Sequence, residues 1–195
     1  MLRRAFDILA SFLGLLALLP LFAGLAVWVK LDSRGPVFYR APRVGRGGKP
    51  FKLWKFRSMA ADAASRGPGI TAGGDPRVTR AGAFLRKTKM DELPQLINVL
   101  CGEMTFVGPR PEDPRYVAKR PELYAGALEL KPGITGAGSL AYRDEESVLA
   151  GKDLETAYFE EVLPRKLAAD VAYARRQTLW SDIGMILKTV GRMFR

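Results

Sequence analysis

The sequence predicts a mainly helical α+β fold, with an N-terminal membrane helix, a small β-hairpin and a helical domain that ends in an amphipathic helix. Three observations lead to this prediction. An apolar run of 22 residues near the N-terminus contains no charge. Residues 35–59 hold two strand-like segments around a glycine-rich turn, and helical patterns dominate the rest of the chain. We divide the chain into residues 1–34, inserted in the membrane, and residues 35–195, which include the amphipathic helix 179–194.

The uncharged run extends from Ile8 to Val29, and Ser11 is its only polar residue. As a helix it would be about 33 Å long, close to the thickness of the hydrocarbon core of a bilayer. A signal peptide is not expected, because the run is long and no small-residue cleavage site follows it. A buried soluble helix would need a large apolar partner surface, which the rest of the chain does not offer.

Two membrane arrangements remain, a straight span and a re-entrant helix that bends and returns to the same face. Pro20 lacks an N–H and clashes with the preceding turn, which predicts a bend in the middle of the run. Cationic residues flank both ends, and the positive-inside rule disfavours placing either flank outside. We therefore favour the re-entrant arrangement. The flanking cations are Arg3 and Arg4 before the run, and Lys30 and Arg34 after it.

Turn residues and periodicity place the remaining elements. Strand-like segments 37–39 and 51–56 flank a turn at 45–48, and glycine and proline predict a loop over 60–80. Residues 132–136 are predicted as an ordered turn. The last helix has one apolar face with basic residues beside it, and this face either packs in the core or lies in the membrane interface. The predicted helices occupy residues 81–88, 92–101, 112–128, 153–176 and 179–194.

Charge and composition narrow the possible functions. The net charge is +11, and residues 1–60 contain 11 Lys/Arg against 2 Asp/Glu, so the positive charge lies around the apolar run. That distribution suits an anionic membrane surface. Residues 61–195 are almost neutral, which argues against a nucleic-acid-binding protein. The absence of histidine excludes Ser-His-Asp and Cys-His catalysis and His-ligated metals, and the lone Cys101 excludes an internal disulfide.

Two adjacent acids, Asp91 and Glu92, stand just before an apolar-periodic helix. Pro94 belongs in a first helical turn, so Asp91 is expected near the N-cap, where free amides and the helix dipole favour the ionised form. An ionised carboxylate there can act as a nucleophile or as a metal ligand. Two acids before a helix can also serve only as a cap, and the spacing alone leaves both interpretations open.

Cationic residues surround the acidic pair. Arg86 precedes it, and Arg110 follows the helix between two prolines that fix the backbone around it. A rigidly held guanidinium suits a phosphate group. Acids, cations and a fixed arginine together favour phosphoryl transfer, in which the protein mainly positions groups and neutralises charge, commonly with Mg²⁺.

One long motif carries a family resemblance. Residues 75–111 read DPRVTRAGAFLRKTKMDELPQLINVLCGEMTFVGPRP, which closely resembles the signature of the bacterial sugar transferases. These are monotopic phosphoglycosyl transferases that initiate polysaccharide or glycoprotein glycan assembly. The likeness extends over nearly the whole chain and includes the apolar helix with its central proline, PFKLWKFRSM, KPGITG, and the DxxY sequence at Asp170–Tyr173.

The resemblance implies an enzyme that moves a sugar-1-phosphate from a UDP-sugar to polyprenyl (undecaprenyl) phosphate, giving polyprenyl-diphosphosugar and UMP. Asp91 would attack the β-phosphate and carry the phosphosugar covalently, and Glu92 with Asp91 would hold Mg²⁺. It also implies a re-entrant helix in the bacterial inner membrane and an active site on the cytoplasmic face. The alternative is a non-catalytic, membrane-tethered scaffold of the same fold.

The resemblance further implies a set of substrate-binding residues. Arg86 would contact phosphate and Arg110 the nucleotide. Three other residues match polar positions of the family more loosely and are carried as substrate-binding candidates: Arg57, Arg143 and Asp170.

The sequence departs from the family pattern at two places. Leu19 stands before Pro20, where many relatives have a serine whose hydroxyl can satisfy a freed carbonyl. Residues 137–142 replace a stretch in which relatives often carry tryptophan and glutamine. Because this second stretch is expected to border the site, it bears on the choice of sugar or acceptor.

Overall fold

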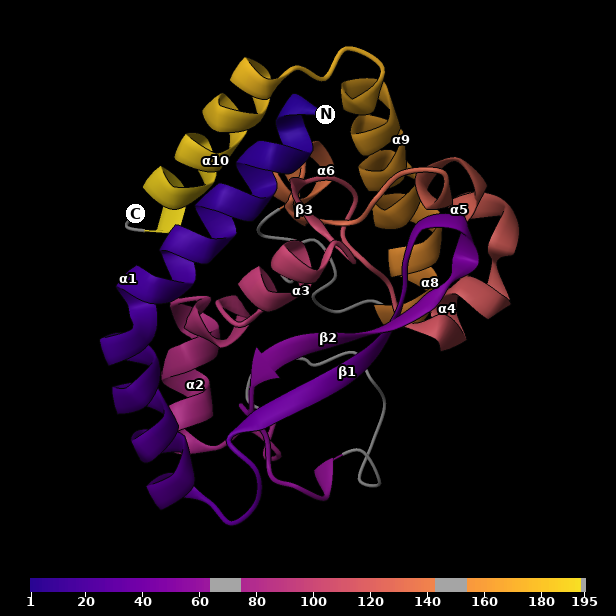
Figure 1. The fold of residues 1–195 in the computed structure, drawn as a ribbon. Coiled ribbons are helices and arrows are strands. Elements are labelled where there is room, and N and C mark those ends of the chain that lie inside the picture. Colours follow the sequence, from indigo (N-terminus) through magenta and orange to yellow (C-terminus); the bar gives the residue numbers. More distant parts are fainter. Residues whose placement is uncertain (64–74, 143–153, 194–195) are drawn as a thin grey trace.

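The computed structural model describes residues 1–63, 75–142 and 154–193, and its framework is helical. The apolar N-terminal run forms α1 (Leu2–Asp32), which extends along one side of the molecule (Figure 1). α1 is one uninterrupted helix with Pro20 inside it, rather than two arms folded back on each other. In the described part of the chain it is the one helix long and apolar enough to cross a membrane. The predicted return to the same membrane face stays a prediction.

The first turns of α1 are held by polar contacts. Arg4 donates hydrogen bonds to the carbonyls of Val99 and Leu100, at 2.6 and 2.9 Å. Asp7 is buried and accepts a hydrogen bond of 2.8 Å from the hydroxyl of Thr105. These contacts satisfy carbonyls at the end of a helix and a buried hydroxyl, so they fix the position of the N-terminal half of α1.

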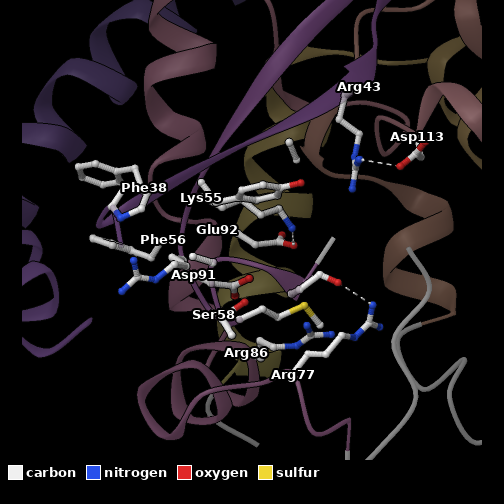
Figure 2. A pocket seen from close by; sticks show the side chains of 18 of the residues that line it. Phe38, Arg43, Lys55, Phe56, Ser58, Arg77, Arg86, Asp91, Glu92 and Asp113 are labelled. Carbon is white, nitrogen blue, oxygen red and sulfur yellow. Dashed lines mark hydrogen bonds and ion pairs between the residues drawn. The ribbon is translucent and has the colours of Figure 1, made fainter. Parts of the chain in front are cut away.

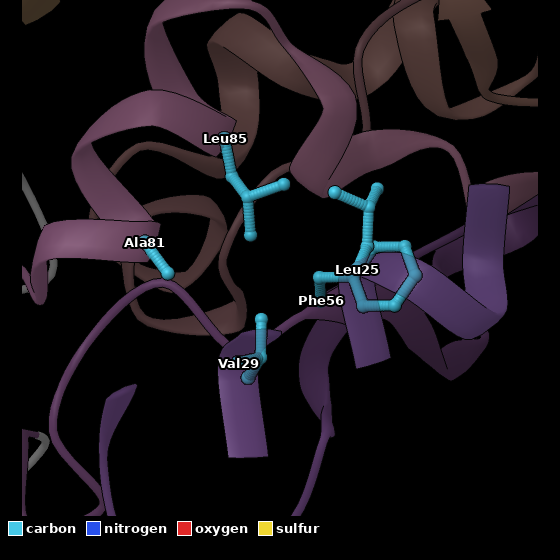
Figure 3. Packing of buried hydrophobic residues seen from close by; sticks show 5 residues of the cluster. All are labelled: Leu25, Val29, Phe56, Ala81 and Leu85. Carbon is cyan, nitrogen blue, oxygen red and sulfur yellow. The ribbon is translucent and has the colours of Figure 1, made fainter. Parts of the chain in front are cut away.

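The last turns of α1 are held by apolar packing. Leu25 and Val29 are buried against Phe56, Ala81 and Leu85, which come from two other elements (Figure 3). The opposite face of α1 stays open, because few of its apolar side chains find a partner in the described chain. The large side chains exposed on α1 are Leu2, Ile8, Leu9, Phe12, Leu13, Leu16, Leu19, Leu21, Val27, Trp28 and Leu31.

The predicted β-hairpin is confirmed. β1 (Phe38–Val44) pairs antiparallel with β2 (Pro50–Phe56), and a short 3-10 turn at Arg46–Gly48 connects them. The strands are longer than the apolar segments suggest, because polar residues at the turn end also join the ladder. Ala41 and Leu53 face each other in the register and are buried in the core.

α2 (Arg80–Lys87) approaches the segment after β2 very closely. Its N-cap is Thr79, whose hydroxyl oxygen accepts a hydrogen bond from the amide of Gly82 at 3.0 Å. A Cβ at Gly82 would lie 1.9 Å from the carbonyl oxygen of Ser58, so only glycine permits this approach. The contact sets α2, and with it Arg86, beside the end of the hairpin.

The acidic pair lies in a separate 3-10 turn, Met90–Glu92, and α3 begins only at Gln95 and ends at Cys101. The prediction that Asp91 lies near the N-cap of a helix starting at residue 92 is therefore wrong. Pro94 has no N–H to donate backward, so regular α-helical bonding cannot continue from the turn into α3. Asp91 thus lacks the free amides of a helix start.

α3 is tied to the hairpin by a buried amide. The side-chain nitrogen of Asn98 donates to the carbonyl of Lys52 and to the carboxylate of Glu103, at 2.9 and 2.7 Å. Its oxygen accepts from the backbone amide of Trp54 at 2.9 Å. Because an unpaired buried amide is costly, this set of bonds fixes α3, and the turn before it, against β2.

A second, parallel strand pair was not predicted. β3 (Thr105–Val107) pairs with β4 (Gly133–Thr135), which covers part of the expected turn 132–136. A Cβ at Gly108 would lie 2.3 Å from the carbonyl oxygen of Lys131, so glycine is required where the two chains pass. This crossing leads directly into the Pro-Arg-Pro turn and sets the course of Arg110.

Most of the remaining helices lie on the side of the molecule away from α1, and the last helix lies alongside α1 (Figure 1). The predicted helix 112–128 is two helices, α4 (Pro114–Lys119) and α5 (Pro121–Leu128), because the residue before Pro121 leaves the helical region. The predicted helix 153–176 is described as α8 (Leu154–Ala157), a π-helical turn (Tyr158–Val162) and α9 (Leu163–Ala174). α6 is Ala137–Ala141, and α10 is Leu179–Met193.

Together these elements confirm a mainly helical fold with a small sheet and one long apolar N-terminal helix. α10 leaves Trp180, Leu187 and Val190 exposed, as the interfacial interpretation of the last helix requires. Its other side packs against β3 and β4, and Thr189 forms a hydrogen bond of 2.7 Å with Thr135. One face of this helix therefore packs in the core, and the membrane-interface interpretation of its exposed face stays a prediction.

Candidate active site

A cavity of about 360 Å³ opens between the hairpin, α2 and the acidic turn. Figure 2 shows Asp91 and Glu92 inside it, between Arg86 and Arg77 on one side and Arg43 on the other. The volume falls in the range of pockets that hold small organic ligands. The 3-10 turn, the end of β2 and the Pro-Arg-Pro turn thus converge on one enclosed space.

Asp91 carries an unpaired oxygen inside this cavity. Its side chain is 6% exposed, and its Oδ1 atom is buried with no hydrogen-bond partner among the described residues. Burial raises the pKa of Asp91 above its ordinary value, the charge of Lys55 opposes this, and the charge of Glu92 adds to it. A buried carboxylate with a free oxygen is poorly solvated, so it is a stronger nucleophile and ligand than an exposed one.

Glu92 lies in the opposite electrostatic situation. Arg110 donates two hydrogen bonds, of 2.5 and 3.2 Å, to the carboxylate of Glu92, and Lys55 donates a third of 2.9 Å. Burial alone would raise the pKa of Glu92, but the charges of Arg110 and Lys55 and their hydrogen bonds hold it well below its ordinary value. Glu92 is therefore a fixed anion that positions two cations at the edge of the cavity.

Cations outnumber acids along the cavity. Two of the arginines are neutralised locally, since Arg77 pairs with Asp75 and Arg115 with Asp113. Within the described chain, no hydrogen bond or ion pair holds the side chain of Arg86. A surplus of positive charge favours an anionic ligand. The lining residues described include eight cations, Arg43, Lys55, Arg57, Arg77, Arg86, Lys89, Arg110 and Arg115, and three acids, Asp91, Glu92 and Asp113.

Arg57 is the most buried of these cations, with 4% of its surface exposed. Its Nη2 atom donates to the carbonyls of Val29 and Ser33, at 3.0 and 2.7 Å, and so ties the end of α1 to β2. Its Nε and Nη1 atoms are buried without a partner in the described structure. Arg57 therefore has hydrogen-bonding capacity beyond its structural contacts, at the wall of the cavity.

One wall of the cavity is aromatic. Phe38 and Phe56 stack with ring centroids 5.1 Å apart, and Tyr39 beside them is 50% exposed. All three line the cavity. Phe56 is 1% exposed and packs with Phe38 in the apolar cluster at the end of α1, so Tyr39 is the ring open to a flat ligand group, while the cations can hold charged groups.

The structure brings five of the predicted site residues into this one cavity: Asp91, Glu92, Arg86, Arg110 and Arg57. Their roles stay predictions, but their convergence supports the view that they work together. A sixth residue, Arg143, lies outside the described residues.

Asp170 belongs to a different part of the fold. It is buried on α9 and accepts a hydrogen bond of 2.8 Å from the amide of Gly138, at the start of α6. The pKa of Asp170 is raised to about 6, because burial outweighs the hydrogen bonds from Gly138 and Ala137 that lower it. It does not line the cavity that holds Asp91, so the structure gives it an anchoring contact to α6.

Lys55 and Lys89 are two of the five described cavity cations that the predicted site did not include. Lys55 shares a strand face with Leu53 by alternation, and a charge on an otherwise inward face is a signal that can be read without a structure. Lys89 has a backbone φ of 58°, the left-handed region that residues other than glycine seldom occupy. No sequence pattern predicts a left-handed backbone conformation for a lysine.

The donor set of the cavity is compatible with a magnesium ion. Among the described residues no group of three or more acids could form a protein cage for a metal. Mg²⁺ at phosphoryl-transfer sites instead uses one or two carboxylates and completes its shell with phosphate oxygens and water. The free Oδ1 of Asp91 beside Glu92 fits that pattern.

Comparisons with known proteins agree with this geometry. A family model described as bacterial sugar transferase matches residues 1–195. The chain is 39% identical over 198 residues to a UDP-glucose:undecaprenyl-phosphate glucose-1-phosphate transferase of Escherichia coli, covering all of this chain and 40% of that protein. A protein of the same description from Caulobacter vibrioides is 38% identical over 194 residues, which cover 96% of this chain and 68% of the relative.

A third relative has a different sugar in its name. The chain is 35% identical over 191 residues to the UDP-N-acetylgalactosamine-undecaprenyl-phosphate N-acetylgalactosaminephosphotransferase of Aeromonas hydrophila. The match covers 96% of this chain and 42% of that protein. The chain thus spans about two fifths of the Escherichia coli and Aeromonas relatives, and the matched region is common to proteins that differ in their sugar.

Proposed function

This chain belongs to the bacterial sugar transferase family, and from that membership we propose that it transfers a sugar-1-phosphate from a UDP-sugar to polyprenyl phosphate. The printed names of the relatives support this, since they describe transfer of a sugar phosphate to undecaprenyl phosphate. Their sugars differ, so the sugar of this chain is left open. The products are polyprenyl-diphosphosugar and UMP.

The observation that carries the proposal is the buried carboxylate of Asp91, with one unpaired oxygen, in a cavity whose lining cations outnumber its acids. A UDP-sugar brings a flat uracil ring, a doubly charged diphosphate and a sugar. The exposed ring of Tyr39 suits the first, and the cations suit the second. We assign the guanidinium of Arg86 to the phosphate groups. We assign the guanidinium of Arg110 to the nucleotide.

We assign the first chemical step to Asp91. Its carboxylate oxygen attacks the β-phosphorus of the UDP-sugar, and the bond from that phosphorus to the bridging oxygen breaks. The electron pair leaves with UMP, and the sugar phosphate stays on Asp91 as a mixed anhydride. Neighbouring cations hold the charge that moves onto UMP, which is the main task of a protein in phosphoryl transfer.

The second step regenerates the enzyme. A phosphate oxygen of the polyprenyl phosphate attacks the same phosphorus, and the bond to Asp91 breaks to restore the carboxylate. Neither step needs an external oxidant or reductant, and histidine, which the chain lacks, is not required. Both nucleophiles are anions, so the protein has no proton to remove at either step.

Mg²⁺ is part of the proposal. Asp91 and Glu92 are the residues that would hold it, together with oxygens of the diphosphate. It would neutralise charge on the phosphate oxygens when bound. Glu92 also keeps Arg110 and Lys55 at the edge of the cavity, whatever the occupancy of the metal.

We further propose that α1 enters the membrane from the cytoplasmic face and that both its ends stay on that face. Its start is bonded to Val99 and Leu100, and its end packs against α2. From Arg4 to Val29 the helix rises about 37 Å, more than the hydrocarbon core of about 30 Å. A perpendicular span would therefore draw part of the polar domain into the bilayer. The exposed apolar side chains of α1 and α10 are the surface available to lipid.

The test is UMP release from a panel of UDP-sugars, including UDP-glucose and UDP-N-acetylgalactosamine, with polyprenyl phosphate and Mg²⁺. We expect UMP from at least one donor and none from the Asp91→Asn variant, because an amide of the same shape is a poor nucleophile. If the wild-type chain releases UMP from no donor, the scaffold alternative replaces this proposal.

A further inference from the structure

A second cavity of about 360 Å³ lies on the other side of the acidic turn, between α3, the β3–β4 pair and α10. Its wall is largely apolar, unlike that of the first cavity. The apolar side chains that matter here are Leu93 and Leu96 from the start of α3, Phe106 and Ile134 from the strands, and Ile186 and Val190 from α10.

The two cavities meet at three charged residues. Lys89, Glu92 and Arg110 line both of them. Asp91 lines the first cavity, and its neighbour Glu92 lines both, so the second cavity ends beside the acidic turn. The cations at the junction can face a phosphate group from either side.

The backbone of Lys89 is strained at this junction. Its φ of 58° lies in the left-handed region, which costs a lysine about 1 kcal/mol or more. This conformation lets the chain leave α2 and enter the acidic turn while the exposed side chain of Lys89 borders both cavities. Strain kept beside a reacting group is common where a side chain must be positioned.

The outer end of the second cavity reaches the surface that we assign to lipid. Val190 lines the cavity and is 45% exposed, and Leu187, about one turn before it on the same helix, is also exposed. Arg192 donates a hydrogen bond of 2.6 Å to the carbonyl of Leu140, which holds this end of α10 across the cavity. Exposed apolar side chains of α10 thus border this end of the cavity, beside the guanidinium of Arg192.

We propose that the second cavity is the entry site of the lipid acceptor, with its isoprenoid chain between α3 and α10 and its phosphate at Lys89 and Arg110. This inference rests on the proposed function. Its chemical basis is the match between an apolar wall with cations at the inner end and an apolar chain with a terminal phosphate.

The shared junction also accounts for two successive displacements at one phosphorus. The uridine occupies the first cavity and the isoprenoid the second, but both ligands place a phosphate at the same cations. UMP must leave the junction before the lipid phosphate can take its position. The lipid oxygen then attacks from the side that UMP vacated, in line with the bond to Asp91 that breaks.

The experiment compares two tryptophan variants on α10. Val190→Trp fills the mouth of the second cavity, and Leu187→Trp is the matched control, because Leu187 is 66% exposed and does not line that cavity. Both add an aromatic ring to the lipid-facing side of one helix. Each protein is assayed in two ways, by UMP release with donor alone and by turnover with varied polyprenyl phosphate.

We expect UMP release with donor alone to match the wild type within about twofold in both variants, as for substitutions at partly exposed positions. For Val190→Trp we expect the KM for polyprenyl phosphate to rise about tenfold, since overpacking an occupied apolar site opposes binding. The control should keep the wild-type KM.

Several results would overturn the inference while leaving the proposed function intact. These are an unchanged KM in Val190→Trp, an equal rise in both variants, or slowed UMP release with donor alone in Val190→Trp. In contrast, a wild-type chain that releases no UMP from any donor removes the proposed function and this inference with it.

Discussion

Asp91 and Glu92 are adjacent in the chain, yet their surroundings push their pKa values apart. Burial raises the pKa of Asp91, whereas Arg110 and Lys55 outweigh burial and lower the pKa of Glu92. Two neighbouring carboxylates can then serve different roles, one reactive and one structural. The two pKa values differ because Arg110 and Lys55 form their hydrogen bonds with Glu92 and not with Asp91. The two carboxylates therefore have opposite effects on the stability of the fold.

Replacing Asp91 by asparagine should stabilise the folded chain at neutral pH. The pKa of Asp91 is raised in the fold above its ordinary value of 3.8, so ionising it costs stability, and this cost is full above the raised pKa and absent below about 3.8. We expect Asp91→Asn to show a higher Tm than the wild type at pH 7 and the difference to vanish as the pH falls toward 4. Thermal unfolding in detergent across this range measures it, and a lower Tm at pH 7 would contradict the burial argument.

Replacing Glu92 by glutamine should have the opposite effect. The pKa of Glu92 lies below its ordinary value of 4.5, so its stabilising contribution is present above about 4.5 and is lost as the pH falls through the lowered pKa. We expect Glu92→Gln to lose about 1–2 kcal/mol of unfolding free energy at pH 7, because Arg110 and Lys55 lose their anionic partner. Denaturant unfolding at several pH values tests this. A loss that persists unchanged below pH 4 would exclude the charge as its cause.

At the residue scale, the sequence predicts which residues form the site better than it predicts their contacts and backbone conformation. Residue types and spacing pointed to Asp91, Glu92, Arg86 and Arg110, and all of them line one cavity. The expected amide contacts of Asp91 were wrong, because the proline that marks the helix start also separates the acidic turn from it. The sequence shows Lys89 among the cations just before the acidic pair, but its left-handed backbone and its position between two cavities carry no sequence signal.

At the element scale, α1 is bound to the domain by a few specific polar contacts. The buried Asp7 accepts hydrogen bonds from the hydroxyl of Thr105 and the amide of Phe106, at 2.8 and 3.4 Å. A carboxylate inside an otherwise apolar helix needs such partners. Asp7 therefore sets the rotation of α1 and determines which of its faces is left for lipid.

Truncating Asp7 should weaken the attachment of α1 to the domain without changing the lining of the cavity that holds Asp91. We expect Asp7→Ala to lose about 1–3 kcal/mol of stability, because the hydroxyl of Thr105 and the amide of Phe106 are left unpaired. Asp7→Asn should lose less, since its amide oxygen can still accept from Thr105. Thermal unfolding of both variants in the same detergent measures the difference. Equal losses in the two would show that the hydrogen bonds do not anchor the helix.

The elements that the sequence predicted best are those with local signals. The hairpin followed from its turn glycines and apolar strands, and the long helix from its uncharged run. The β3–β4 pair was missed, because strands of three residues carry no periodic pattern and their pairing joins residues about 28 apart along the chain. Pro121 was a local signal that residues 112–128 form two helices. The helical pattern on both sides of Pro121 led instead to the prediction of one helix.

At the scale of the whole molecule, one side of the protein is apolar and the active-site cavities lie beside it. The exposed side chains of α1, with Trp180, Leu187 and Val190 of α10, form the apolar side. The first cavity lies beside the hairpin and the second beside α10. In the proposed function the nucleotide donor uses the first cavity and the lipid acceptor the second, and the two cavities meet at the acidic turn.

The proposed membrane arrangement predicts that both ends of α1 are accessible from one side. Single cysteines at Leu2→Cys and Arg34→Cys, in a Cys101→Ser background, place a thiol at each end of the helix. In sealed vesicles of known orientation, we expect an impermeant maleimide to label both positions from the cytoplasmic side. Labelling of the two positions from opposite sides would establish a straight span.

The central claim is that Asp91 becomes covalently bound to the sugar phosphate during each cycle. The intact mass of the protein, measured after incubation with a UDP-sugar and Mg²⁺ but no lipid, tests it most directly. We predict a gain of one sugar phosphate located on Asp91, its loss when polyprenyl phosphate is added, and no gain in Asp91→Asn. A wild-type chain that converts donor and lipid to product, but never carries this mass on Asp91, would contradict the account.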